Sequence, residues 1–406
     1  MTKPIHHLAA IAAILAAPAT AKIDPTLLKA ATAEAPAVTK TLESLVNIES
    51  GTGDAEGMAA LGTLIETALK AQGAKVERVA PLPISKGDII VGRLTGTGRK
   101  NLLLLSHMDT VYQRGALAKA PFRIEGGKAY GPGIADDKGG IAVILHALKL
   151  LKPADYGSLT IVINTDEEKG SLGSGAIITE LARGKDAVLS FEPTTMPEQL
   201  WRATSGTNTV TAVIKGKASH AGAAPEQGIN ALVEAAHVIE ATRDLDQGPG
   251  KLRFNWTVIG QSPAGVRNII PDNITLVGDL RTSTTAQFDT FKAEITRRLA
   301  KPSLPGAEIQ LEVRVNRPPF TATHASDALI ARARAIYADL GHPLEIEPRS
   351  GGGTDAGYAA LANVPVIESL GLPGYGYHTG AAEYVFLEAV PRRLYLAAEL
   401  IRQLGK

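Results

Sequence analysis

The stretch Leu159-Thr-Ile-Val-Ile-Asn-Thr-Asp-Glu-Glu168 decides how this chain folds and what it can bind. Residues 159–164 form an apolar run typical of a β-strand, and two adjacent glutamates, Glu167 and Glu168, follow shortly after it. Two further apolar runs end in a similar way: Leu102–Leu105 is followed by His107 and Asp109, and Ala187–Phe191 is followed by Glu192. Sites in open α/β sheets form at the C-terminal ends of the strands. The sequence therefore predicts one site at this edge of a sheet.

The residue types at this edge are those that bind divalent metals. Imidazole together with several carboxylates suits zinc or a similar ion. The candidates exceed the four ligands of one tetrahedral ion, so we expect two ions. Each feature has an ordinary alternative, because a His-x-Asp pair or a loop histidine is often structural and an acidic pair often belongs to a solvated turn. Recurrence at three strand ends favours the metal site.

The adjacent glutamates are expected to divide into two roles. Successive residues of an extended segment point in different directions, so only one of Glu167 and Glu168 can easily bind a metal. The other can act as general base toward a water. Asp136, in a Gly/Pro turn before a helical pattern, is a further carboxylate candidate, although an aspartate there can also cap a helix. Asp137 can serve as that cap and leave Asp136 free.

Composition excludes several classes of protein. The 406 residues exceed what one core usually serves, so two domains are expected. A net charge of +1 and an aromatic content of 4% argue against nucleic-acid partners, and the charge argues against anionic membrane surfaces. The chain has no cysteine, so neither disulfides nor thiolate ligands are available.

The N-terminus has the form of a secretory signal peptide. An Ala/Ile/Leu run from Leu8 to Ala17 precedes the small-x-small site Ala19-Thr-Ala21. The run is too short for a permanent membrane anchor. Residues 1–21 are therefore predicted to be removed on export, with a bacterial periplasm as the destination. The alternative is an ordinary buried helix near the terminus.

The remaining chain is predicted to fold as two interleaved domains. Strand and helix patterns alternate through residues 22–206 and resume at 318–406, which indicates an α/β domain with a mostly parallel sheet and helices on both faces. Its first helices are expected between Ala37 and Gln72. Residues 207–317 read β-α-β-β-α-β, the order of a ferredoxin-like α+β module. We expect this module to be an insertion into the sheet domain.

Six segments together point to a known family: Ser106–Val111, Gly131–Gly140, Asn164–Gly170, Gly216–Gly222, Gly351–Asp355 and Gly376–His378. Through them the chain resembles the dinuclear-zinc exopeptidases and amidohydrolases. Within that group it is most similar to the bacterial glutamate carboxypeptidases of the carboxypeptidase G type. The resemblance covers essentially the whole chain after the N-terminal segment.

The resemblance implies a role for each candidate at the metal site. It makes His107 and Glu192 ligands of one zinc ion, Glu168 and His378 ligands of a second, Asp136 the bridge between them, Glu167 the general base and Asp109 the residue that orients His107. It also implies a cis peptide bond after Asp136.

The resemblance further implies a homodimer formed through the inserted module. His220, in Gly216–Gly222, reaches the partner's site, where a histidine can donate to a developing oxyanion. Asn268 and Arg281 are implied as ligands of the substrate carboxylate, with Arg317 and Gly353 as further candidates. An arginine suits this task because its fork pairs with a carboxylate bidentately.

One position departs from the glutamate-specific relatives, which carry a lysine shortly after the residue that corresponds to Glu192. This chain has Gln199 there, and Arg202 follows nearby. A neutral amide holds a γ-carboxylate less strongly than an ammonium does, so the preferred side chain stays open unless Arg202 compensates.

The sequence as a whole predicts an exported zinc carboxypeptidase that releases a C-terminal amino acid, glutamate or similar, from peptides, folate-like or N-acyl substrates. Three alternatives stand beside this prediction. An N-acyl amino acid amidohydrolase would use the same chemistry on other substrates, and a non-catalytic metal- or peptide-binding homologue would bind without turnover. A single-zinc protease of unrelated fold is disfavoured, because no His-Glu-x-x-His occurs.

Overall fold

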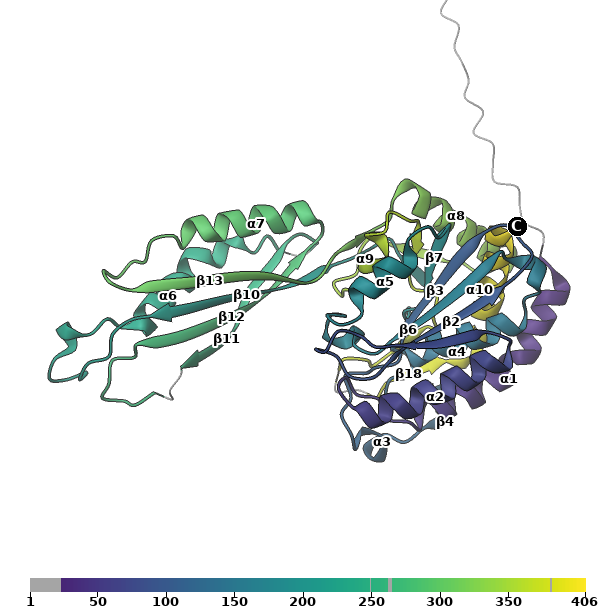
Figure 1. The fold of residues 1–406 in the computed structure, drawn as a ribbon, viewed down its shortest axis with the longest axis horizontal. Coiled ribbons are helices and arrows are strands. Elements are labelled where there is room, and N and C mark those ends of the chain that lie inside the picture. The colour runs from purple at the N-terminus through teal and green to yellow at the C-terminus, as the bar shows by residue number, and fades with distance from the viewer. Residues whose placement is uncertain (1–22, 249, 262–264, 380–381) are drawn as a thin grey trace, which may run out of the picture.

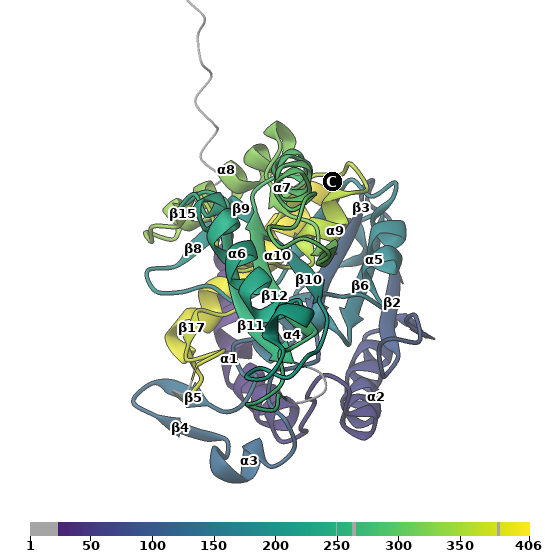
Figure 2. The same ribbon diagram turned by 90° about the vertical axis from the view of Figure 1, so that its left-hand side faces the viewer.

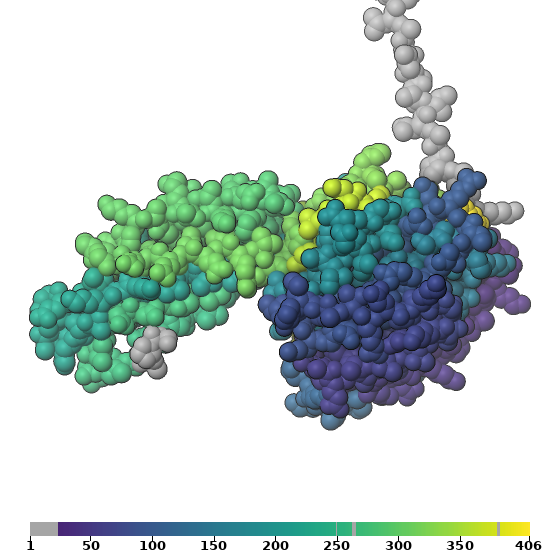
Figure 3. Space-filling model, viewed as in Figure 1, coloured from purple at the N-terminus to yellow at the C-terminus, as the bar shows by residue number. Residues whose placement is uncertain are grey.

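The computed structural model describes residues 23–406 except 249, 262–264 and 380–381. The predicted signal peptide, residues 1–21, lies outside the described residues. The described chain forms a large lobe and an arm that extends from it (Figures 1 and 3). Within the described ranges, no helix has both the length and the apolar character needed to cross a bilayer.

The large lobe is built on a six-stranded sheet. In spatial order its strands are β1 (Lys75–Val79), β2 (Ile89–Thr95), β6 (Ser158–Asn164), β3 (Asn101–His107), β7 (Ala187–Ser190) and β16 (Val366–Ile367). The pairs β6–β3, β3–β7 and β7–β16 are parallel, whereas β1–β2 and β2–β6 are antiparallel. β3 is buried from Leu102 onward, as expected for a strand covered on both faces. The predicted α/β class is confirmed.

Helices flank this sheet (Figure 1). They are α1 (Pro25–Val46), α2 (Ala55–Ala71), α4 (Lys138–Lys149), α5 (Gly175–Ala182), α8 (His324–Asp339), α9 (Ala356–Ala360) and α10 (Val390–Gly405), whereas the four-residue α3 (Ala116–Lys119) lies away from the sheet. The expected start near Ala37 was wrong: α1 begins at Pro25, with Asp24 capping it and Pro36 inside it. The side chain of Asp24 accepts from two backbone amides of the first turn, which fixes the earlier start.

The arm has its own sheet and core. Its elements are β10 (Gly206–Lys215), α6 (Ala231–Thr242), β11 (Arg253–Gln261), β12 (Asn273–Thr282), α7 (Thr285–Arg298) and β13 (Glu308–Arg317). The strand order β11-β12-β10-β13 is that of a ferredoxin-like fold. Both α6 and α7 contact β12, and Figure 2 shows this lobe from its outer end. A cluster that includes Val210, Leu276 and Phe291 forms a core separate from that of the large lobe.

Several short strands lie outside the two large sheets, some of them where the chain passes between the lobes. β8 (Gln199–Trp201) pairs with β15 (Glu345–Glu347), and β9 (Ala203–Thr204) pairs with β14 (Phe320–Thr321). A small four-stranded sheet has the order β17 (Gly374–Tyr375), β18 (Tyr384–Phe386), β5 (Lys128–Tyr130) and β4 (Arg123–Glu125). This sheet brings Tyr130 and Tyr384 side by side.

Candidate metal centre and active site

Two groups of potential metal ligands meet at the C-terminal edge of the main sheet. One contains His107, Asp136 and Glu192, the other Asp136, Glu168 and His378, and in each group the candidate ligand atoms lie within 4.8 Å of one another. β3 ends at His107, Glu192 follows β7, and Glu168 lies beyond β6 in the short 3₁₀ helix η2 (Glu167–Lys169). Asp136 belongs to both groups. All five predicted ligands are therefore brought together.

The two oxygens of Asp136 face different histidines. Oδ1 lies 3.0 Å from Nε2 of His107, and Oδ2 lies 3.1 Å from Nε2 of His378. His378 Nε2 also lies 3.0 Å from a Glu168 oxygen, and His107 Nε2 lies 3.7 Å from a Glu192 oxygen. The arrangement gives each half of the site one imidazole, one carboxylate of its own and one shared carboxylate oxygen.

Burial makes this cluster of carboxylates unfavourable without cations. Burial raises the pKa of Glu192 well above its ordinary value, despite the nearby imidazole of His107. Oε1 of Glu168 is buried and makes no hydrogen bond within the described chain. Buried charges are stable when they are paired or coordinate metals. The donor set of nitrogens and carboxylate oxygens therefore fits two zinc-like ions.

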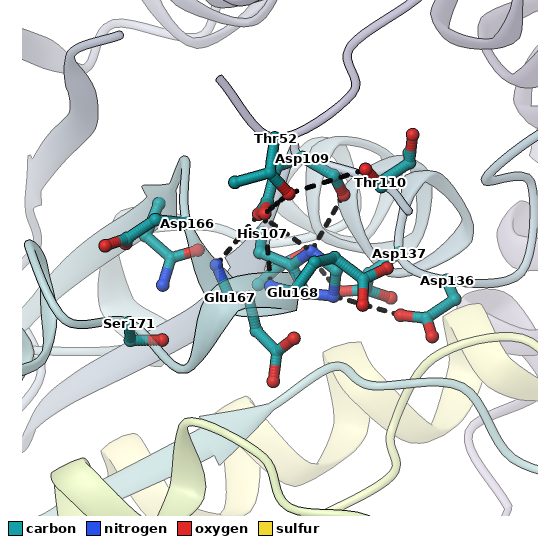
Figure 4. Close-up of polar contacts among 12 residues, drawn as sticks. Thr52, His107, Asp109, Thr110, Asp136, Asp137, Asp166, Glu167, Glu168 and Ser171 are labelled. Carbon is teal, nitrogen blue, oxygen red and sulfur yellow. Dashed lines mark hydrogen bonds and ion pairs between the residues drawn. The ribbon is translucent and has the colours of Figure 1, made fainter. Parts of the chain in front are cut away.

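Asp109 connects His107 to the turn that carries the two glutamates (Figure 4). Nδ1 of His107 lies 3.1 Å from the backbone carbonyl of Asp109 and 3.3 Å from its carboxylate. The same carboxylate accepts from the amides of Glu167 at 3.0 Å and Glu168 at 3.1 Å, and from Thr52 Oγ1 at 2.7 Å. Such contacts fix the ring orientation of a metal ligand.

The two glutamates do separate, but not because the segment is extended. That premise was wrong, since they lie in the first turn of η2. Glu168 points to His378, whereas Oε1 of Glu167 lies 2.6 Å from Nη1 of Arg317. Burial raises the pKa of Glu167 well above its ordinary value, and the Arg317 guanidinium opposes that rise. A buried carboxyl with a raised pKa is suited to accept a proton near neutral pH.

The sequence left open whether Asp136 caps a helix. In the structure Asp137 caps α4, because its side chain accepts from the amide of Gly140 at 3.2 Å. Asp136 is therefore free for the site, and the peptide bond between the two aspartates is cis, as the resemblance implied.

A cleft of about 690 Å³ opens beside the ligands. Arg281, Arg317, Gly353 and Trp201 are among the residues that line it. Arg281 is held bidentately by Asp279 at 2.7 and 2.9 Å. A side chain at Gly353 would place its Cβ 2.6 Å from a backbone carbonyl oxygen and 3.3 Å from Cδ of Arg317. Glycine is thus favoured here chiefly because a Cβ would clash with the backbone carbonyl of Ser205.

The structure shows the surroundings of Gln199, the residue that leaves the preferred side chain of the substrate open. Nε2 of Gln199 donates to Thr195 Oγ1 at 2.8 Å. Trp201, two residues further along β8, lines the cleft. The compensating role considered for Arg202 is unsupported, because its guanidinium is paired with Asp327 at 2.6 Å outside the cleft.

Two predicted site residues lie far from the cleft of their own chain. His220 and Asn268 follow the outer ends of the arm's strands, where the amide of Ala221 donates to the carbonyl of Asn268 at 2.9 Å. The ten residues of β10 span about 30 Å between the cleft and His220. Nδ1 of His220 accepts from two backbone amides at 3.0 and 3.2 Å. The proton of the neutral ring is therefore carried by Nε2, which can donate.

Sequence reasoning missed two residues that support the site. Thr52 binds Asp109, and the carboxylate of Glu383 accepts from backbone amides of the loop before Asp136. No spacing pattern reveals either of them, because a single hydroxyl or carboxylate that binds backbone groups leaves no repeat in the sequence.

This fold, with paired ligand groups at the sheet edge, defines a metal-dependent hydrolase. The model of the peptidase family M20/M25/M40 matches residues 103–403, and the chain belongs to this family. It is 54% identical over 413 residues to carboxypeptidase G2 of Pseudomonas sp. (strain RS-16), covering 99% of both chains. The chain is thus a metallo-carboxypeptidase of this family, and the resemblance inferred from its motifs is confirmed.

Solved structures show the same fold at lower identity. A Staphylococcus aureus tripeptidase has a TM-score of 0.79 at 23% identity, with 91% of this chain and 98% of that chain covered. The aminopeptidase PepT of Bacillus cereus has a TM-score of 0.74 at 22% identity, with 92% and 99% covered. These likenesses concern the fold alone.

Proposed function

We propose that this protein is an exported, dinuclear zinc carboxypeptidase that releases a C-terminal amino acid, glutamate or similar, from peptides, folate-like or N-acyl amino acid substrates. The observation that carries the proposal is the pair of ligand groups sharing Asp136, with Glu167 beside them in the same cleft. The 54% identity to carboxypeptidase G2 supports the choice of leaving group.

The ligand assignment follows the contacts. His107 and Glu192 would hold one zinc ion, His378 and Glu168 would hold the other, and Asp136 would be the carboxylate that the two groups share. When bound, the zinc ions supply Lewis acidity that polarises the scissile carbonyl and makes a water more acidic. Asp109 keeps His107 oriented and fixes the amides of the turn that carries Glu167.

Glu167 is the proposed general base. Its carboxylate takes the proton of the attacking water and passes it to the leaving amine. Arg317, which contacts Glu167 at 2.6 Å, and Arg281 line the same cleft and are suited to the C-terminal carboxylate of the substrate. Gly353 lies in the same wall of the cleft, where a Cβ would meet the backbone carbonyl of Ser205.

A second copy of the chain is proposed to complete the site. His220 and Asn268 belong to the substrate set but lie at the outer end of the arm, so they serve a partner's cleft rather than their own. β11 is an edge strand with Val258 and Ile259 each 56% exposed, and exposed apolar edges favour pairing with another chain. The arm is therefore the dimerisation module.

Two finer points complete the proposal. Residues 1–21 act as a signal peptide that directs the enzyme to the periplasm, consistent with the apolar run and the small-residue cleavage site. The alternative of an N-acyl amino acid amidohydrolase with a non-glutamate preference is favoured by one observation, namely that Trp201 lines the cleft beyond Gln199.

The function is tested by Glu167→Ala with Glu180→Ala as control, since Glu180 is a glutamate on an exposed helical surface with a side chain 74% exposed. We expect Glu167→Ala to lower kcat by roughly 10²–10⁴-fold while two zinc ions per subunit remain bound. Release of free amino acids from folyl-glutamate, dipeptide and N-acyl substrates is measured alongside zinc content. Near-normal turnover of the Glu167 variant would show that the base is misassigned.

A further inference from the structure

A buried carboxylate organises the loop that presents Asp136. Glu383 immediately precedes β18, and only 4% of its surface is exposed. Its Oε2 accepts from the amide of Gly133 at 2.9 Å, and its Oε1 accepts from the amides of Ala135 at 2.8 Å and Asp136 at 3.0 Å. One side chain therefore satisfies three backbone donors of a single turn.

The backbone adds a fourth contact at the same place. The carbonyl of Glu383 accepts from the amide of Gly131 at 3.1 Å. This register follows from the pairing of β18 with β5, in which Tyr384 lies opposite Tyr130. The loop from Gly131 to Asp136 is thus attached along its length to one residue that lies far away in the sequence.

Residues 131–136, which carry these amides, are all buried. The loop joins a three-residue strand to the start of α4, and the donors of Gly133, Ala135 and Asp136 point inward. A buried amide without an acceptor costs about 1–3 kcal/mol. Removal of the carboxylate therefore leaves the turn free to move toward other acceptors, and Asp136 moves with it.

The charge of Glu383 has a buried counterpart. The ammonium of Lys138 is 1% exposed, donates to the carbonyl of Ile48 at 2.9 Å and is attracted by Glu383. Burial, and after it the negative charge of Glu383, raises the pKa of Tyr112. The three hydrogen bonds from backbone amides hold the carboxylate in place.

We propose that Glu383 is a positioning residue for both metal ions, because it holds the backbone of the one carboxylate that the two ligand groups share. The inference rests on the proposed dinuclear site. Outer contacts of this kind typically contribute 10–100-fold to metal affinity. Since Asp136 serves both groups, loss of Glu383 weakens both binding steps, whereas loss of an unshared ligand weakens chiefly one.

The experiment compares the wild-type enzyme with Glu383→Gln, with Glu388→Gln as control, since Glu388 is an exposed glutamate five residues further along. Zinc is removed, and zinc binding is titrated in competition with a chromophoric chelator. Circular dichroism of the metal-free proteins verifies folding, and His378→Ala supplies the profile expected for loss of one unshared ligand. We expect Glu383→Gln to weaken both zinc steps by roughly 10–100-fold and the control to match wild type.

The outcomes separate this inference from the proposed function. Two normal zinc steps in folded Glu383→Gln would overturn the positioning role, as would weakening of only the step lost in His378→Ala. Fewer than two zinc ions bound by the wild type would instead overturn the dinuclear site itself. Because the glutamine keeps the shape of the side chain, it remains informative even where Glu383→Ala fails to fold.

Discussion

Removal of the Glu198 carboxylate is predicted to destabilise the large lobe strongly without touching the cleft. Glu198 is 5% exposed and joins three distant parts of the chain. Its Oε1 accepts from Arg392 Nε at 2.8 Å, and its Oε2 accepts from Arg393 Nε at 2.8 Å and from the hydroxyl of Tyr337 at 2.6 Å. Arg393 and Tyr337 have no exposed surface.

The magnitude follows from what is left behind. In Glu198→Ala the guanidinium of Arg393 stays buried with a hydrogen bond to the carbonyl of Ser369 at 3.2 Å, and its Nη2 already has no acceptor in the described chain. Breaking a buried pair in this way costs about 3–5 kcal/mol. The expected loss in Tm is roughly 6–20 °C at about 2–4 °C per kcal/mol.

The pH dependence adds a second signature. Burial opposes ionisation of Glu198, but Arg393, Tyr337 and Arg392 together hold its pKa below the ordinary value of 4.5. A carboxyl with a lowered folded-state pKa stabilises the protein above its unfolded pKa, and this contribution is lost as pH falls through the folded pKa. The gap between wild type and Glu198→Gln should therefore be full at neutral pH and shrink below about pH 4.5.

The assay is calorimetric unfolding of wild type, Glu198→Ala and Glu198→Gln, with Glu180→Ala as control. The Glu180–Arg183 pair is 74% and 61% exposed, so its loss should cost less than about 1 kcal/mol. A loss for Glu198→Ala no larger than for the control would refute the reasoning. A gap to Glu198→Gln that persists unchanged to pH 3 would refute the electrostatic part of it.

Three further predictions follow from single features of the cleft and the arm. Gln199→Lys should raise the ratio of kcat/KM for C-terminal glutamate over neutral residues by roughly 10-fold or more, measured on matched dipeptides; an unchanged ratio would place the side-chain pocket elsewhere. Val258→Lys should convert dimer to monomer in analytical ultracentrifugation, because it puts charge on the exposed edge strand; a persistent dimer would contradict the proposed interface. A chelator should remove zinc in two phases, the faster from the group with His378, whose side chain is 50% exposed against 1% for His107; a single phase would contradict this order.

Much of the site could be predicted, because the amino-acid sequence itself indicates where buried strands end. Four consecutive leucines before His107 and the β-type run before Glu167 mark buried parallel strands, and parallel strands deliver their following residues to one edge. The sequence pattern did not indicate which ligands would bind which of the two expected ions. That assignment came from resemblance, because spacing alone cannot show which oxygen of Asp136 faces which histidine.

The supporting contacts were harder to predict for a physical reason. Glu383 and Glu198 act through backbone amides and arginines that come from remote segments, so neither sits in a local pattern. In sequence each resembles any surface glutamate, and only burial distinguishes them. The early start of α1 was missed for a different reason, since Pro36 inside the helix looks like a boundary.

His220 lies at the tip of the arm, so a role for it at the metal centre depends on the proposed dimer. Its ring is oriented by two amides at the tip of the arm, about 30 Å of strand away from its own cleft. In a twofold dimer each subunit both gives and receives such a residue. If His220 serves the partner's cleft, then dissociation by Val258→Lys must remove turnover together with the dimer, although Val258 contacts no metal ligand. Active monomers would show instead that the cleft is complete within one chain and that the histidine has another task.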